Sequence, residues 1–215
     1  MYGSYERLRE FEDAARRTKP ALTMSLSTLL SHLHNTPSVY SFYRGVISEV
    51  QAIADARLFL GYENHLTFGV LSLDGRGLAQ YGDVTVVIND RYIAQRASVT
   101  ETDSVAMVKK HVLSDELPRG FRATWNQRAK LAVAKLGHLI RSDTTLDTFP
   151  DLILREGEGS FRDDFFPVQI YGEVNKATFR SVHVRHRAEN AVDSVSLEAA
   201  RALCNRDGIA FELVE

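Results

Sequence analysis

The sequence predicts a single α+β domain in which amphipathic helices come early and the strands of a mainly antiparallel sheet are completed late. Apolar residues recur at helical spacing in the first 36 residues and again between residues 123 and 140. The segment 84–88, VTVVI, and several stretches after residue 151 are instead rich in β-branched and aromatic residues. The chain has 215 residues, of which 44% are hydrophobic and 25% are charged, so it is long enough to bury one core. We therefore expect one domain over residues 1–215, with an N-terminal helical segment, 1–36, and a sheet-containing core, 37–215.

The helices are predicted from apolar spacing, capping residues and breakers. The segment 102–112 should begin at a cap, Thr102 or Asp103, and the helix before it should begin at Ser48. In the longest helix the inward stripe is Trp125, Ala129, Ala132, Leu136, Leu139 and Ile140. The expected helical segments are 5–17, 22–33, 48–61, 102–112, 123–140 and 196–205.

The strands are predicted from β-branched and aromatic runs bounded by turn residues. The run 84–88 should be buried, and 92–99 should pair with it as a hairpin through the turn at Asn89 and Asp90. The other expected strands are 40–46, 152–154, 165–171, 178–184 and 209–214.

Composition excludes several protein classes. The only cysteine, Cys204, lies on the apolar side of an expected helix, so neither a disulfide framework nor a thiolate metal site is expected. The N-terminal residues are charged and lack the apolar region of a signal peptide, and no run of about 18 apolar residues occurs. We expect a cytoplasmic protein without a membrane partner.

The formal net charge is -2, but basic residues concentrate between residues 105 and 141. Such a basic stretch attracts phosphate, so a nucleic-acid partner at these helices is one expectation. The alternative is an ordinary solvated helix exterior that lies against the acidic segment 143–164.

Residues 40–104 combine polar donors with five glycines besides Gly45, which favours a cleft because glycine lets a ligand approach the backbone closely. Arg44 beside Gly45 is suited to a phosphate or a carboxylate, and His65 to a ribose or a proton. Structural ion pairs and incidental loop positions are the alternatives for these side chains. The five glycines are Gly61, Gly69, Gly75, Gly77 and Gly82.

Several hydroxyl and carboxyl side chains are further candidates for a functional site. Ser72 and Ser98 do not lie in a Gly-x-Ser-x-Gly elbow, which disfavours serine hydrolase chemistry. Asp163, Asp164 and Glu173 flank the expected strand 165–171, where a carboxylate at the sheet edge can face a cleft. His183 and His186 lack carboxylate companions at a metal-binding spacing, so no metal site is expected.

Together, Tyr43-Arg44-Gly45, the helix after it, the glycine-rich segment and Ala79-Gln80-Tyr81-Gly82-Asp83 before a Val/Ile strand resemble the front half of the mono-ADP-ribosyltransferase-like families, which include bacterial toxins. The resemblance covers about residues 40–171 and implies NAD as the substrate. It implies that Arg44 contacts NAD and that Ser72 or Ser98 shapes the nicotinamide pocket. The family glutamate is expected within 166–171, where this chain has Pro167 and Gln169.

The missing glutamate leaves Glu173, Asp163 or Asp164 as substitutes. With the resemblance, the expected catalytic residues are Glu173, Asp164 and Ser98, and the expected nucleotide-binding residues are Arg44, Gly45, His65, Ser72 and Tyr81. One fixed carboxylate is the central electrostatic need, since breaking the nicotinamide–ribosyl bond develops positive charge on the ribose.

Three functions remain open from the sequence. The first is an NAD-dependent ADP-ribosyltransferase-like enzyme, such as an intracellular toxin or defence effector, that acts on an unknown macromolecular acceptor. The second is a noncatalytic interaction or structural protein, or a subunit of a larger assembly. The third is a nucleic-acid-binding protein or nuclease, although the strand 165–171 supplies neither the acid nor the lysine that a metal nuclease needs.

Overall fold

The computed structural model describes residues 2–35, 49–111, 120–157, 164–185 and 191–214. They form an eight-stranded sheet in the order β5-β4-β6-β2-β1-β3-β7-β8. All neighbouring strands are antiparallel except β7 and β8, which are parallel. The expected α+β fold is therefore confirmed. The strands are β1 (Lys19–Met24), β2 (Leu66–Ser72), β3 (Val84–Ile88), β4 (Ala97–Thr100), β5 (Arg122–Thr124), β6 (Pro167–Tyr171), β7 (Phe179–Arg185) and β8 (Ala210–Val214).

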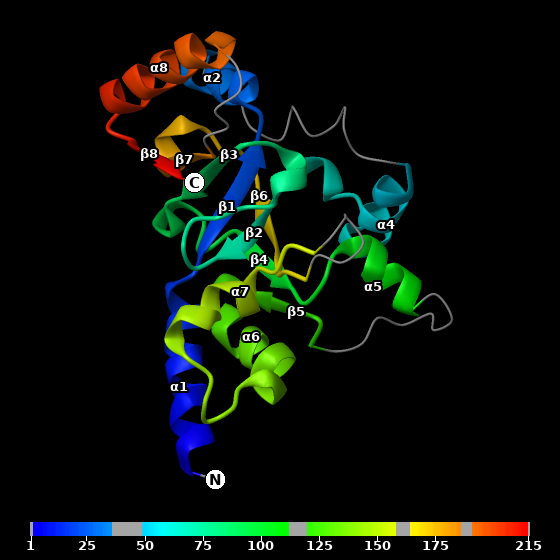
Figure 1. Ribbon diagram of the computed structural model, residues 1–215. Coiled ribbons are helices and arrows are strands. Elements are labelled where there is room, and N and C mark those ends of the chain that lie inside the picture. The colour runs from blue at the N-terminus through cyan, green and yellow to red at the C-terminus, as the bar shows by residue number, and fades with distance from the viewer. Residues whose placement is uncertain (1, 36–48, 112–119, 158–163, 186–190, 215) are drawn as a thin grey trace.

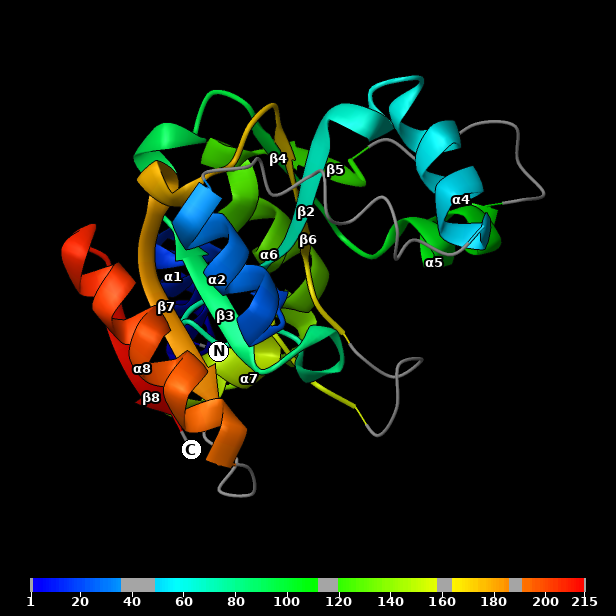
Figure 2. The ribbon, with the colours of Figure 1, turned by 90° about the horizontal axis from the view of Figure 1, so that it is seen from above.

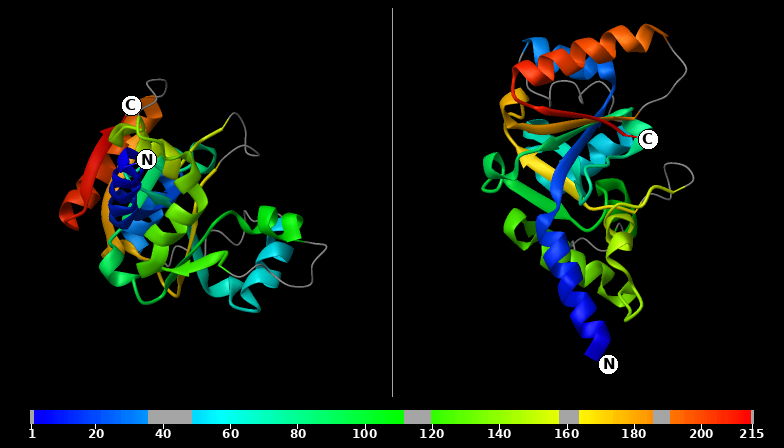
Figure 3. Two further views of the ribbon diagram at one scale, coloured as in Figure 1. Left: turned by 90° about the horizontal axis from the view of Figure 1, so that it is seen from below. Right: turned by 60° about the vertical axis from the view of Figure 1, so that its left-hand side comes forward.

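The helices gather in three places around this sheet (Figure 1). α1 (Tyr2–Arg17), α6 (Arg128–Leu136) and α7 (Phe149–Ile153) lie at the end where β1 begins, and α2 (Leu26–Asn35) and α8 (Ala191–Arg206) lie where β1 ends. α4 (Glu49–Phe59) and α5 (Ser104–His111) contact each other to one side of the sheet, beyond β5 and β2 (Figure 2). α1 packs against α6, and its N-terminal end extends beyond the other elements (Figure 3).

The two faces of the sheet bury different clusters because alternate side chains of a strand point to opposite faces. One face carries the main core, to which Leu71, Val86 and Ile170 belong together with apolar residues of α1, α2, α6, α7 and α8. The other face carries a small cluster of Ala21, Val70, Leu78 and Leu154. Near α4 and α5 it carries a third cluster, Leu58, Phe59, Leu66 and Met107.

The expected helix 22–33 was wrong at its beginning. Lys19–Met24 is instead the central strand β1, whose residues from Pro20 onward are buried, and the helix begins only at Leu26. Ser25 separates the two elements, and its hydroxyl accepts a hydrogen bond from the Thr28 backbone N–H at 3.2 Å. The segment 1–36 thus contributes a strand to the centre of the sheet besides its helices, because burial between two neighbouring strands overrides helical spacing.

The expected hairpin of 84–88 with 92–99 was also wrong. Residues Asp90–Tyr92 form a short 3₁₀ turn, in which the Asn89 side chain accepts a hydrogen bond from the Arg91 backbone N–H at 3.3 Å. The chain then crosses to the other half of the sheet, where β4 pairs with β5 and β6. A turn of Asn and Asp can lead the chain to a distant strand as well as into a hairpin. Turn composition alone therefore does not identify the strands with which β4 pairs.

Two further segments differ from expectation. Residues 152–154 belong mostly to α7 rather than to a strand, and the expected helix 123–140 begins as strand β5 and continues through a 3₁₀ turn into α6. Of its inward stripe, Leu139 is 37% exposed, whereas the other members are buried. β2 was not expected as a strand at all.

Several predictions are confirmed. The helix 5–17 and the strands 84–88, 165–171, 178–184 and 209–214 match observed elements closely, as does the helix 196–205 within α8. Asp103 caps α5 by accepting a hydrogen bond from the Ala106 backbone N–H at 2.8 Å. The expected strand 40–46 lies outside the described residues.

Candidate functional site

A chain of polar side chains crosses the sheet from β4 to β6. Ser98 and Gln169 face each other in the antiparallel register, and the Ser98 hydroxyl donates to Gln169 Oε1 at 3.0 Å. Gln169 Nε2 then donates to Thr100 Oγ1 at 2.9 Å. Gln169 and Thr100 are 2% and 3% exposed, so these contacts hold the amide in one orientation.

Arg122 joins this chain from β5. Its Nε donates to Ser98 Oγ at 2.9 Å, and its guanidinium carbon lies 5.5 Å from the centroid of the Phe59 ring. Desolvation by neighbouring atoms lowers the pKa of Arg122, although its side chain remains exposed. Among the described residues no carboxylate forms an ion pair with it, so Arg122 offers a cation to an anionic ligand.

Arg122 also borders a pocket of about 390 Å³, a volume within the range of small-molecule sites. Two partly exposed rings stand at this pocket, Tyr62 and Tyr171, with their centroids 6.1 Å apart in an edge-to-face arrangement. Aromatic rings beside a cation suit a ligand that combines a planar ring with negative charge. We call the pocket and the polar chain together the β4–β6 site. The pocket is lined by Leu58, Phe59, Leu60, Tyr62, Leu66, Arg122 and Tyr171.

One of the expected residues, His65, lies beside this pocket, and Glu173 follows Tyr171 by two residues in the chain. The His65 ring centroid is 6.2 Å from that of Tyr171, and the Gly172 backbone N–H donates to the His65 carbonyl at 2.9 Å. Glu173 is held through its carbonyl, which accepts from Arg96 Nη2 at 2.7 Å. Desolvation lowers the pKa of Arg96, and the nearby Glu173 charge opposes this shift. The β4–β6 site therefore includes two expected residues, Ser98 within it and His65 at its border.

The remaining expected residues lie elsewhere. His65 precedes the first residue of β2, whereas Ser72 ends that strand, so these two are separated by its full length. Asp164 is paired with Lys135 at 2.5 Å, and Tyr81 is 54% exposed in the 3₁₀ turn Ala79–Tyr81. Arg44, Gly45 and Asp163 lie outside the described residues. The structure thus does not gather the described nucleotide-binding residues around one point.

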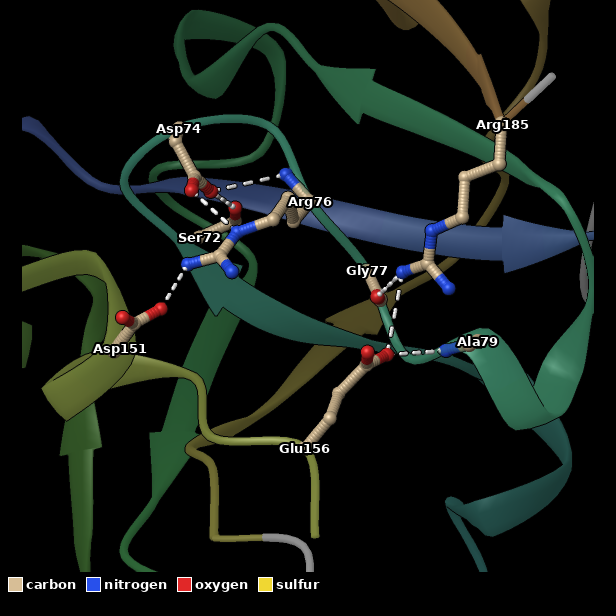
Figure 4. A network of polar contacts seen from close by, with 8 residues as sticks. All are labelled: Ser72, Asp74, Arg76, Gly77, Ala79, Asp151, Glu156 and Arg185. Carbon is tan, nitrogen blue, oxygen red and sulfur yellow. Dashed lines mark hydrogen bonds and ion pairs between the residues drawn. The ribbon is translucent and has the colours of Figure 1, made fainter. Parts of the chain in front are cut away.

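Ser72 belongs to a second polar group, in which every arginine faces a carboxylate (Figure 4). Arg76 contacts Asp74 at 2.5 Å and Asp151 at 2.6 Å. Arg185 contacts Glu156 at 3.2 Å. We call Asp74, Arg76, Asp151, Glu156 and Arg185 the loop cluster, because it fastens the segment 73–83.

The loop cluster also uses backbone groups of that segment. Arg185 Nη2 donates to the Gly77 carbonyl at 2.6 Å, and Glu156 Oε1 accepts from the Ala79 backbone N–H at 2.5 Å. Ser72 donates to Asp74 Oδ1 at 3.2 Å. A pocket of about 350 Å³ lies beside the cluster, but the charges of Arg76 and Arg185 are already balanced, so the arrangement indicates structural fastening.

The glycines of this region serve close packing more than an open cleft. A Cβ on Gly69 would lie 2.8 Å from the Ala21 carbonyl oxygen, and one on Gly77 would lie 2.1 Å from Thr23 Oγ1. Gly82 has a φ of +140°, and a Cβ on it would lie 2.3 Å from the Met24 carbonyl oxygen. Of the five, Gly61 alone has open space around it. The density of glycines thus reflects how the segment 73–83 lies on the sheet.

Some basic residues between 105 and 141 point into the protein. Arg128 is 7% exposed; it donates to the Trp125 carbonyl at 2.9 Å and to Thr18 Oγ1 at 3.2 Å. Lys135 pairs with Asp164 and donates to the Glu101 carbonyl at 2.7 Å. Two of the cations that suggested a nucleic-acid surface therefore act in packing.

In the described part of the chain, no group of three or more His, Cys, Asp or Glu side chains is placed to hold a metal ion. No helix there has both the length and the apolar character needed to cross a bilayer. In comparisons with known proteins, no family model matches the chain and no curated protein matches its sequence.

The sequence predicts no role in the site for Arg122, Thr100, Tyr62 or Tyr171. Gln169 stands out in the sequence only because it differs from the glutamate that the resemblance implies. One signal was present, a glutamine between Val168 and Ile170 in an apolar strand. A buried amide requires hydrogen-bonding partners on a neighbouring strand, and Ser98-x-Thr100 supplies them on one face.

Proposed function

We propose that the protein binds NAD or a closely related nucleotide at the β4–β6 site and that it is a catalytically weak relative of the ADP-ribosyltransferase-like proteins. The observation that carries the proposal is the hydrogen-bonded chain of Arg122, Ser98 and Gln169 at the edge of an aromatic pocket. A planar base or nicotinamide ring fits against Tyr62 and Tyr171, and a phosphate fits Arg122.

Gln169 is the reason to expect binding without efficient transfer. The resemblance places a glutamate on this strand, and the residue that contacts the predicted serine here is an amide. An amide carries no negative charge, so it gives little stabilisation to the positive charge that develops on the ribose. Glu173 follows four residues later in the chain and is not among the residues that line the pocket.

Calorimetric titration with NAD and with ADP-ribose tests the binding proposal. The parent protein should bind one molecule of nucleotide, and Arg122→Gln should weaken the affinity by about tenfold, as expected for loss of a charged hydrogen bond. Arg155→Gln is the matched control, because Arg155 is an exposed arginine beside the pocket of the loop cluster. Absence of binding to either nucleotide at saturating concentration would refute the proposal.

Gln169→Glu tests the reason for weak catalysis. Thr100 and Ser98 hydroxyls can both donate to a carboxylate at this position, so the variant should fold. We expect release of nicotinamide from NAD to rise at least tenfold over the parent, measured by chromatography, with Ser98→Ala in the same background reducing the gain. A variant that folds and binds NAD but releases no more nicotinamide would show that Gln169 does not occupy the catalytic position.

A further inference from the structure

A second group of reactive side chains lies on β7 and β8, which three strands, β2, β1 and β3, separate from β6. Ser181 Oγ lies 2.8 Å from His183 Nε2, and the other ring nitrogen, His183 Nδ1, lies 3.5 Å from Glu212 Oε2. A hydroxyl, an imidazole and a carboxylate in this order form the arrangement that activates a serine nucleophile.

The backbone explains why these groups meet. Ser181 and His183 are two residues apart on β7, so they share one face of the sheet. β8 runs parallel to β7, and its register places Glu212 directly beside His183. Figure 3 shows these two strands side by side at the edge of the sheet.

His183 is also covered by a neighbouring segment of the chain that contains Gly75. Its side chain is 14% exposed, and a Cβ on Gly75 would lie only 2.7 Å from His183 Cε1. The ring is therefore covered by the segment 73–83 that the loop cluster fastens. Ser181 remains partly exposed, so a small reagent can reach its hydroxyl.

The geometry also favours one tautomer of His183. The negative charge of Glu212 lies beside Nδ1, which favours hydrogen on Nδ1 and leaves Nε2 free to accept from Ser181. His183 in this form is the base, Ser181 is the nucleophile, and Glu212 is a positioning residue.

We propose that Ser181 is an activated nucleophile toward small activated acyl esters, a function separate from nucleotide binding. Ser181 Oγ bonds to the acyl carbon while its proton passes to His183 Nε2; the ester C–O bond breaks, and the leaving alcohol takes that proton. Water then attacks the acyl-serine, gives a proton to His183, and releases the carboxylic acid as the proton returns to Ser181.

The test is covalent labelling by a fluorophosphonate, followed by mass spectrometry of the labelled peptide. In this reaction the Ser181 Oγ–P bond forms, fluoride leaves and His183 receives the proton. We expect label on Ser181, none in Ser181→Ala, and a labelling rate at least tenfold lower in His183→Gln. Ser142→Ala is the matched control, because Ser142 is an exposed serine that belongs to neither site.

Glu212→Gln separates positioning from mere packing. This variant should lower the maximal labelling rate constant by about threefold to tenfold and leave the half-saturating reagent concentration unchanged. Glu198→Gln, at an exposed glutamate of α8, should change neither value. Circular dichroism and thermal melting confirm that each variant is folded.

Two outcomes would overturn the proposal. One is that the folded parent protein takes no label at Ser181 while a serine hydrolase labels fully under the same conditions. The other is that His183→Gln labels as fast as the parent. Hydrolysis of p-nitrophenyl acetate gives an independent readout, with an initial burst expected for the parent and none for Ser181→Ala.

Discussion

The β4–β6 site and the loop cluster are both built around arginines, but they treat the guanidinium group in opposite ways. In the loop cluster, Arg76 and Arg185 each contact carboxylates (Figure 4). In the β4–β6 site, Arg122 contacts a serine hydroxyl and a phenylalanine ring, and within the described residues no carboxylate is paired with it.

This difference separates two uses of the same side chain. A guanidinium paired with carboxylates joins segments of one chain and has little charge left for a ligand. A guanidinium beside a hydroxyl and an aromatic pocket keeps its charge and most of its donors. The neighbours of an arginine are therefore more informative about its role than the number of basic residues in a stretch.

The largest expected effect on stability is at Gly77, which lies close to Thr23 of β1 in the segment that the loop cluster holds. Gly77→Ala would place a Cβ 2.1 Å from Thr23 Oγ1, so we expect a loss of about 2–3 kcal/mol of unfolding free energy. That loss lowers Tm by about 4–12 °C in a chain of this size. Gly137→Ala is the control, since its Cβ would meet Leu8 at an ordinary 3.4 Å. Equal melting temperatures for the two variants would contradict the close packing.

The next largest expected effect compares how Arg185 of the loop cluster and Arg122 of the β4–β6 site contribute to the unfolding free energy. Glu156→Gln and Arg185→Met, made singly and together, should show a coupling free energy of about 1 kcal/mol in urea unfolding. Arg122→Gln should change the unfolding free energy by less than about 0.5 kcal/mol, because no carboxylate of the described residues is paired with Arg122. If Arg122→Gln destabilised the protein as much as Arg185→Met, the division between structural and ligand-binding arginines would fail.

A buried carboxylate of α4, the helix that supplies Phe59 to the pocket of the β4–β6 site, gives a smaller, pH-dependent effect. Asp55 of α4 is 3% exposed and accepts hydrogen bonds from Ser104 at 2.5 Å and Gln51 at 2.9 Å. Burial raises the pKa of Asp55, and these hydrogen bonds oppose the rise only in part. A raised folded-state pKa means that Asp55 contributes most stability below its unfolded pKa and that this contribution is lost as pH rises through the folded pKa.

Asp55→Asn should therefore raise Tm by about 2–4 °C at pH 7, and the gain should disappear below about pH 4. Thermal melts followed by circular dichroism between pH 3.5 and pH 8, at roughly half-unit steps, measure it. Asp147→Asn, at an exposed position, should leave Tm unchanged across that range. A gain that did not depend on pH would assign the effect to something other than titration of Asp55.

The smallest expected effect concerns Cys204 of α8, which lies outside both the β4–β6 site and the loop cluster. Cys204 is fully buried, and burial, with the nearby Asp207 charge, raises the pKa of its thiol to about 11. We expect almost no alkylation by iodoacetamide in the native protein and complete alkylation in guanidinium chloride, as measured by intact mass spectrometry. Rapid native alkylation would mean that α8 opens locally and that the core is not a rigid reference.

The fold class and most late elements were predictable from the sequence because their signals are local. The run Val84–Ile88 is apolar on both faces, and Asp103 caps α5 directly. β1 and β4 were not predictable in the same way. β1 was assigned to a helix because burial between β2 and β3, which are distant in the chain, decides its state. The partner of β4 is β6, about 70 residues later, which turn composition at Asn89 does not encode.

The candidate site was predictable only in part for the same reason. Ser98 was identified as a hydroxyl, but its partners Gln169 and Arg122 come from strands that sequence reading does not place beside it. His65 and Ser72 look like neighbours in a glycine-rich segment, yet β2 separates them. NAD binding and transfer stay predictions.

The central strand order has a consequence for synthesis of the chain. β4 and β5 can join the remainder of the sheet only through β6, which is translated after most of the protein. The pocket of the β4–β6 site, which Tyr171 of β6 helps to line, thus forms only after β6 has been synthesised. A fluorescent small molecule that binds this pocket would report chains in which β6 has joined the sheet, and not shorter products that end before β6.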